Sequence, residues 1–145
     1  MNGITDFMTQ HHRECDDLFA AAEESVANGK WEKASSDFNL YLKEMARHFA
    51  MEEDVLFPAF DQKTGMEMGP TFVMRSEHEQ MNKVIEDMAQ AVAAKDADAY
   101  LGSAETLMIL TQQHNMKEEQ MLYRMMDQRL SGEAGALLDR VHAIA

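Results

Sequence analysis

The sequence contains few of the residues that interrupt helices or cross-link chains. Its 145 residues include two prolines, seven glycines and one cysteine, Cys15. Met, Leu, Ala, Glu, Gln and Lys dominate instead, and these residues favour helices. The β-branched residues never form an alternating run, so strands are not expected. A single cysteine excludes an internal disulfide, which makes a reducing cytoplasm the expected compartment.

Basic residues and long apolar runs are also scarce. The 13 Lys and Arg residues stand against 26 Asp and Glu residues, a formal net charge of -13. This balance argues against nucleic-acid and anionic-lipid partners, because both require basic side chains. No apolar run approaches the roughly 20 residues that span a bilayer. The N-terminus lacks a basic region followed by an apolar stretch, so a soluble protein without a signal peptide is expected.

Four long segments carry helical periodicity, and a short fifth follows them. The expected helices cover about 4–27, 31–60, 70–95, 96–130 and 133–145. Asn28 and Gly29 form a typical helix end. Pro58 is expected to kink or finish the second helix, whereas Pro70 suits a first helical turn. Short turns make neighbouring helices antiparallel, so we predict one all-α domain over residues 1–145, an up-down-up-down four-helix bundle with a short C-terminal helix.

The two halves of the sequence repeat each other. Residues 48–57 and 114–123 both read His-x-x-x-Glu-Glu-x-x-Leu-aromatic, and the same offset of 66 positions relates His12 to His78. The midpoints between successive histidines fall in the predicted turns, and residues equidistant from a turn lie at one height in an antiparallel hairpin. One level of the bundle is therefore expected to hold four imidazoles, those of His12, His48, His78 and His114.

Two of these histidines share a helix face with a carboxylate. His48 precedes Glu52, and His114 precedes Glu118, by four residues, a spacing that places both side chains on one face. Carboxylates can bridge two cations, and a set of imidazoles and carboxylates without thiolate suits iron, with manganese and zinc as competitors. We predict two metal ions with coordination positions left open, held by His12, His48, Glu52, His78, His114 and Glu118. A metal-free helical interaction module is the alternative.

Other polar and aromatic residues receive simpler interpretations. His11 is expected at the surface or beside the ligands, since its counterpart in the repeat is Glu77. Cys15 is interpreted as a small buried side chain rather than a redox thiol. Tyr123 is expected to pack in the bundle. Two further carboxylates, those of Glu53 and Glu119, either accept hydrogen bonds from the ligating imidazoles or face solvent.

Together these features resemble the hemerythrin-like, or HHE cation-binding, family. The resemblance covers nearly the whole chain and rests on His12-Arg13-Glu14, the two His-x-x-x-Glu-Glu segments, Leu56-Phe57-Pro58, and Gly69-Pro70 leading to Met74 and Glu77-His78-Glu79. It implies a non-haem centre of two iron ions joined by an oxo or hydroxo bridge. Because the six ligands leave coordination positions open, we predict binding or sensing of O2, NO or peroxide rather than turnover. The alternative is iron donation or peroxide consumption, as in relatives that repair iron–sulfur clusters.

The sequence departs from the oxygen-carrying members of that family at two positions. Those members use five histidines, and their third helix carries His-x-x-x-His, which places Asn82 where the fifth histidine would be. Their last helix has an Asp five residues after its His, at the position of Glu119. The internal repeat favours Glu118 as the ligand, and we choose Glu118.

Overall fold

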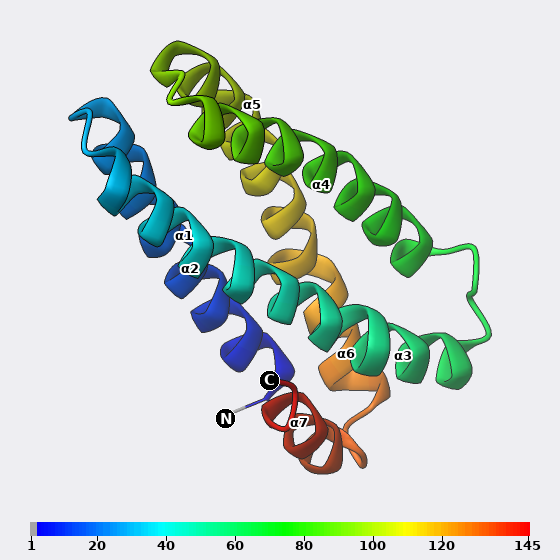
Figure 1. Ribbon diagram of the computed structural model, residues 1–145. Coiled ribbons are helices and arrows are strands. Elements are labelled where there is room, and N and C mark those ends of the chain that lie inside the picture. The colour runs from blue at the N-terminus through cyan, green and yellow to red at the C-terminus, as the bar shows by residue number, and fades with distance from the viewer. Residues whose placement is uncertain (1–2) are drawn as a thin grey trace.

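The computed structural model describes residues 3–145, which form helices joined by short turns (Figure 1). The helices are α1 (Ile4–Ala27), α2 (Trp31–Ala50), η1 (Met51–Leu56), α3 (Phe57–Thr64), α4 (Pro70–Ala94), α5 (Ala97–Lys117), η2 (Glu118–Leu122), α6 (Tyr123–Arg129) and α7 (Ala134–His142). The π-helical segment η1 joins α2 to α3 without a break, and η2 joins α5 to α6 in the same way. The described chain is thus all-α, as predicted.

Four long rods form the bundle: α1, α2 with α3, α4, and α5 with α6. Helices α1 and α2 pack as one hairpin, and α4 and α5 pack as another. Helix α1 also contacts α5 and α6, α2 contacts α4, and α3 contacts α6, so the four rods close into one bundle. Figure 1 shows each rod running opposite to the one before it, with α7 across the end of the bundle where the termini lie. No helix within residues 3–145 is long and apolar enough to cross a membrane.

The helix limits follow the sequence signals, with one exception. Gly29 has a φ of 68°, a conformation that glycine adopts without strain, and it ends α1. Asp96 begins α5 by accepting a hydrogen bond from the backbone N–H of Ala99. The prediction that Pro58 would kink or finish the second rod near residue 60 is wrong in its second alternative, since the helix continues to Thr64. Pro58 lies at the start of α3, directly after the π-helical segment. A proline is tolerated in a first helical turn because a backbone N–H at that position would have no partner within the helix.

An aspartate binds the threonine in the first turn of a helix in each half of the chain. The carboxylate of Asp127 accepts hydrogen bonds from the Ile4 backbone and from the Thr5 hydroxyl, the latter at 2.6 Å. Asp61 accepts from the Thr71 hydroxyl at 2.5 Å. These pairs are separated by the same offset of 66 positions as the histidines. The repeat therefore includes the contacts that fix the starts of α1 and α4.

Two apolar clusters fill the bundle on either side of a polar layer. The cluster near the α1–α2 and α4–α5 turns includes Phe38, Tyr41 and Tyr100. The other includes residues of α7 together with those of α1, η1 and α6, among them Leu137 and Val141. Buried histidine and glutamate side chains occupy the layer between them. Apolar packing above and below therefore isolates this layer from water.

Candidate metal centre

The structure brings all six side chains of the predicted metal site into the polar layer. Each rod contributes one imidazole, and the second and fourth rods each add a carboxylate. The exposed fractions are 4% for His12, 2% for His48, 0% for Glu52, 1% for His78, 2% for His114 and 0% for Glu118. A carboxylate that is fully removed from water needs a compensating partner. The negative charges of Glu52 and Glu118 must therefore be balanced by protons or cations within the layer.

The six side chains form two groups that share their carboxylates. One group contains His12 and His48, the other contains His78 and His114, and both contain Glu52 and Glu118; within each group the potential ligand atoms lie within 4.8 Å of one another. The Nε2 atoms of His78 and His12 lie 3.0 Å and 3.1 Å from oxygens of Glu52 and Glu118, respectively. Two histidine pairs around two common carboxylates match the requirements of a site for two cations.

Several atoms that face the centre of the layer make no well-directed hydrogen bond to any atom of residues 3–145, although His78 Nε2 lies only 3.0 Å from Glu52 Oε1. They are Nε2 of His48, His78 and His114, Oε1 of Glu52 and Oε2 of Glu118. A buried polar atom without a partner destabilises the folded protein, and a charged one does so more strongly. Cations placed among these nitrogen and oxygen atoms would satisfy them. The residues present therefore fit a pair of metal ions.

The other nitrogen of each imidazole is held from outside the centre. Nδ1–H of His12 donates to Glu119 at 2.7 Å, that of His78 to Glu53 at 2.5 Å and that of His114 to Glu77 at 2.8 Å. Nδ1 of His48 shares a hydrogen bond of 2.7 Å with Nδ1 of His11. A carboxylate that accepts a proton from Nδ1 leaves the lone pair of Nε2 for a metal. The alternative in which Glu53 and Glu119 bind ligating imidazoles is the one observed.

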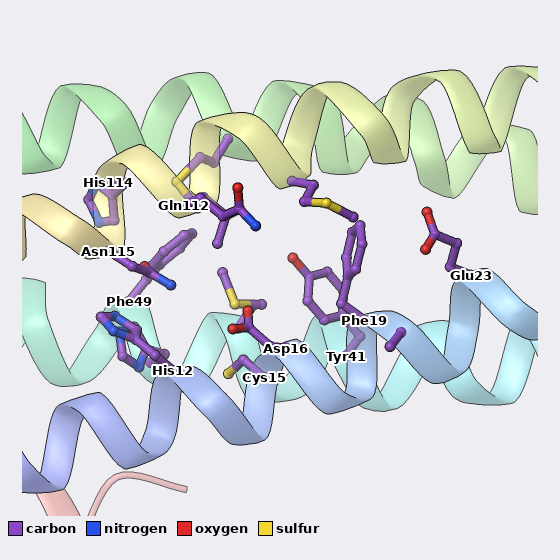
Figure 2. Close-up of a pocket in the computed structure, with 16 residues that line it drawn as sticks. His12, Cys15, Asp16, Phe19, Glu23, Tyr41, Phe49, Gln112, His114 and Asn115 are labelled. Carbon is purple, nitrogen blue, oxygen red and sulfur yellow. The ribbon is translucent and has the colours of Figure 1, made fainter.

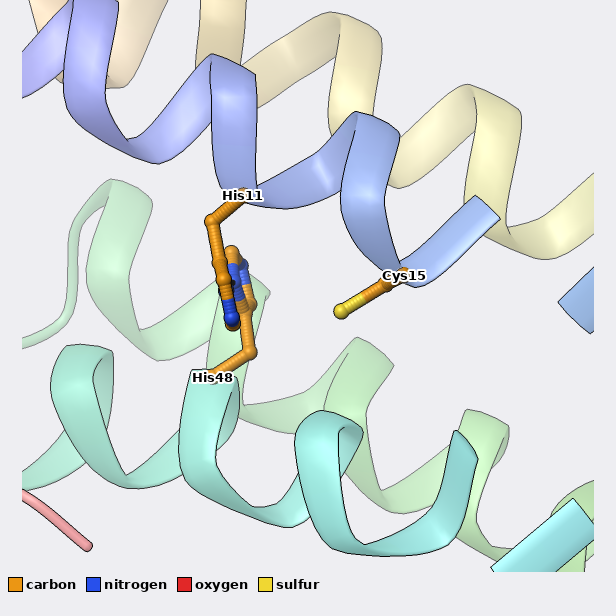
Figure 3. A group of neighbouring side chains, drawn as sticks. All are labelled: His11, Cys15 and His48. Carbon is orange, nitrogen blue, oxygen red and sulfur yellow. Dashed lines mark hydrogen bonds between the residues drawn. The ribbon is translucent and has the colours of Figure 1, made fainter. Parts of the chain in front are cut away.

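His11 is the one member of these outer pairs that breaks the repeat (Figure 3). It is 3% exposed, so the surface position considered for it is wrong and the position beside the ligands is correct. Its ring stacks on that of His48 with centroids 4.9 Å apart, and its Nε2 lies 2.8 Å from Glu44. An imidazole thus supports His48 where a carboxylate, Glu77, supports His114.

Cys15 lies one turn after His11 on α1, with its sulfur near the stacked rings (Figure 3). Burial, reinforced by the nearby charge of Glu44, raises the pKa of the thiol to about 12. A thiol with such a pKa stays protonated at neutral pH and is a poor nucleophile and metal ligand. Cys15 therefore behaves as the small buried side chain that the sequence indicated.

Tyr123 is the functional candidate that sequence reasoning missed. Its side chain is fully buried, and its hydroxyl lies 2.6 Å from Glu52 Oε2, 2.9 Å from Glu118 Oε1 and 3.2 Å from His12 Nε2. Tyr123 therefore contacts the site directly and does more than pack in the bundle. The residue 66 positions earlier is Phe57, so a comparison of the two repeats would have singled out this hydroxyl.

The π-helical segments explain how Tyr123 reaches the centre. Its backbone N–H bonds to the carbonyl of Glu118, and that of Phe57 bonds to the carbonyl of Glu52. In a regular α-helix, a residue five positions after the glutamate would lie about 140° around the axis. The wider turns of η1 and η2 return that residue to the face of the glutamate. Such π-helical insertions are frequent at functional sites.

Asn82, which the resemblance placed where a fifth histidine would be, is not at the centre. It is exposed, whereas Met74 and Met81 are the buried neighbours of His78 on α4. The buried face of α4 therefore passes through Met74, His78 and Met81, and Asn82 lies outside it. Asn82 is therefore not in a position to bind a metal in this layer.

A comparison with protein families gives the identity of this fold and site. The model described as the hemerythrin HHE cation binding domain matches residues 3–126. The chain belongs to this family. Neither a curated protein nor a solved structure gave a match. All six side chains of the polar layer lie within the matched part of the hemerythrin domain, whose family function is to bind metal cations.

In this hemerythrin domain without metal, the carboxylates control the histidine pKa values. Burial lowers the pKa of His12, but hydrogen bonds to Glu118 and Glu119 outweigh burial and raise it to about 10. His78 behaves alike: burial opposes the charged form, yet Glu52 and Glu53 raise its pKa to about 9. Protons on these imidazoles therefore balance the buried carboxylates, and cations would replace them.

A cavity of about 210 Å³ opens beside the polar layer of the hemerythrin domain (Figure 2). The imidazoles of His12 and His114 lie at one end of it, and the carboxylate of Glu23 lies toward the other. Neither Glu52 nor Glu118 lines the cavity. The space is therefore separate from the positions between the shared carboxylates.

Proposed function

We propose that this hemerythrin domain holds two iron ions and that the pair binds or senses a small ligand, either O2 or a relative such as NO or peroxide. The proposed iron ligands are His12, His48, Glu52, His78, His114 and Glu118. The observation that carries the proposal is the pair of four-residue groups that share Glu52 and Glu118. Manganese and zinc are the competing metals for such a ligand set.

The ligand set leaves room for a further molecule. The six residues would offer four imidazole nitrogens and four carboxylate oxygens to the two ions, or four protein atoms per ion. Iron favours about six ligands in sites of this kind, so about two positions per ion remain for a bridge and an exogenous ligand. The iron pair would supply redox-active binding positions there. The hydroxyl of Tyr123, next to Glu52 and Glu118, would orient both carboxylates.

The cavity supports access by a small uncharged ligand. It begins at His12, His48 and His114 and has apolar walls that include Phe49 and Met45. Molecules such as O2 and NO partition into apolar space without losing hydrogen bonds to water. Binding and sensing therefore need no movement of the bundle.

Metal analysis and rapid mixing test the proposal. Metal analysis should give about two irons per chain in the purified protein. In rapid mixing, the visible spectrum of the reduced protein should change on addition of O2 or NO. The Glu118→Gln variant should lose at least half of its iron, because a neutral amide is a weak bridging ligand. The exposed Glu105 offers a matched control, and Glu105→Gln should retain all of its iron. Absence of metal, or no spectral change with either gas, refutes the proposal.

The alternative is donation of iron to damaged clusters, or peroxide consumption. Burial of all six proposed ligands at 0–4% exposure favours retention of the metal instead. Incubation with a strong iron chelator separates the alternatives. Loss of iron within minutes, or catalytic loss of added peroxide, supports the alternative; retention over hours without turnover supports ligand binding.

We also propose that the chain forms one domain that includes α7. This helix lies beyond the matched residues 3–126. Its Leu137 and Val141 are buried in the same apolar cluster as residues of α1 and α6. Limited proteolysis should therefore leave α7 attached to the rest of the bundle.

A further inference from the structure

The cavity beside the polar layer is larger than a diatomic ligand requires. Its volume is about 210 Å³, whereas one water molecule occupies about 30 Å³ in the liquid. Protein interiors rarely leave voids larger than a water molecule, because an unfilled void destabilises the fold. An apolar cavity of about 150 Å³ in another protein binds benzene. The volume by itself therefore admits an organic molecule.

The internal repeat shows which residues create this space. Cys15 and Thr111 line the cavity. The residues related to them by the offset of 66 positions are Met81 and Met45. At both positions a shorter side chain faces the cavity where the other half of the repeat has a methionine. The cavity is thus a local departure from the symmetry that organises the metal ligands.

The walls and ends of the cavity define the chemistry that it can hold. Aromatic and sulfur-containing side chains form the walls, namely Phe19, Tyr41, Phe49, Met45, Met81 and Met108. Figure 2 shows the rings of Phe19 and Tyr41 side by side in the middle of the space. The carboxylates of Asp16 and Glu23 also line the cavity, where they repel anions. Figure 2 shows Glu23 at the end away from the imidazoles and Asp16 nearer to them, beside Cys15. The Thr111 hydroxyl is buried without a hydrogen-bond partner.

We infer that the cavity is a binding site for an uncharged, largely apolar organic molecule of about the size of benzene or toluene. The molecule would lie against the imidazoles at the inner end, beside the proposed metal pair. The inference depends on the proposed function in one respect, which is that metal ions are bound next to the cavity. The class of ligand that reaches the centre then extends beyond gases to small aromatic or branched aliphatic compounds.

Calorimetric titration of the metal-loaded protein with toluene tests the site. We expect saturable binding of one toluene per chain and no binding of benzoate, an anion of similar shape. Cys15→Met and Thr111→Met restore the methionines of the repeat and should each weaken toluene binding at least threefold, and the double variant at least tenfold. Thr106→Met makes the same change at an exposed position of α5 and should leave the affinity unchanged.

The outcomes separate this inference from the proposed function. Absence of saturable toluene binding, or equal binding by the wild type and both single variants, overturns the inference. Saturating toluene should also slow the reaction of the reduced protein with NO at least threefold, because it occupies the route to the centre. Bound toluene with an unchanged rate places the molecule away from the centre and refutes the inference. Toluene binding by a protein that holds no iron leaves the cavity site standing and refutes the proposed function alone.

Discussion

Replacement of Tyr123 by phenylalanine removes one hydroxyl and installs the residue that the other repeat has at Phe57. The hydroxyl donates to Glu52 Oε2 at 2.6 Å in a fully buried layer. A hydrogen bond to a charged group contributes about 1.5–3 kcal/mol to stability. We therefore expect the Tyr123→Phe protein without metal to lose about 2 kcal/mol of unfolding free energy. For a protein of this size, that loss corresponds to a decrease in Tm of about 4–8 °C.

Thermal unfolding followed by circular dichroism, with and without metal, measures this effect. Tyr100 provides the matched control, because it is also fully buried and its hydroxyl has no hydrogen-bond partner within residues 3–145. Tyr100→Phe should leave the Tm unchanged or raise it. In the metal-loaded protein the cost of Tyr123→Phe should shrink, since cations then balance Glu52 and Glu118. Equal Tm changes for both variants would refute the role given to the Tyr123 hydroxyl.

The remaining predictions concern protons and metal. The raised pKa values of His12 and His78, about 10 and 9 against an ordinary value of 6.5, stabilise the metal-free fold fully below pH 6.5. That contribution decreases from pH 6.5 upward and is lost once the pH passes the folded pKa values of about 9 and 10. Urea unfolding should therefore show stability that falls between pH 6.5 and about 10, and a flat profile would contradict the prediction. When the free metal concentration is about 1,000-fold above the Kd, bound metal should add about 4 kcal/mol to the free energy of unfolding. Removal of the metal should therefore lower that free energy by the same amount in the urea assay. Glu119→Gln should weaken metal binding about 10–100-fold in a chelator competition, because Glu119 orients His12. Glu79→Gln, at an exposed position, should not.

Much of the fold was predictable because it depends on local chemistry and on symmetry. The turn at Asn28 and Gly29 and the start of α4 at Pro70 follow from single residues with strong backbone preferences. The common level of the four imidazoles follows from their equal spacing about the turns, since every residue of an α-helix rises by the same distance. A repeat of 66 positions carries this geometry from one half of the chain to the other.

Other features could not be predicted from the sequence, because they do not follow α-helical periodicity. The π-helical segments shift the register within the second and fourth rods, and only this shift turns Tyr123 toward Glu52 and Glu118. It also allows the helix to continue past Pro58. Spacing alone cannot place Asn82 either, since its exposure depends on which side of His78 faces the bundle.

The sequence by itself determined the helical class, the antiparallel rods and the set of imidazoles and carboxylates that meet at one level. These follow from spacing and residue type along single helices. Only the tertiary structure decided which group supports each imidazole, that a phenol joins the centre, and that Cys15 and Thr111 leave a cavity beside it. Those outcomes depend on the rotation of each rod about its axis and on packing between residues distant in the chain, which no single helix specifies.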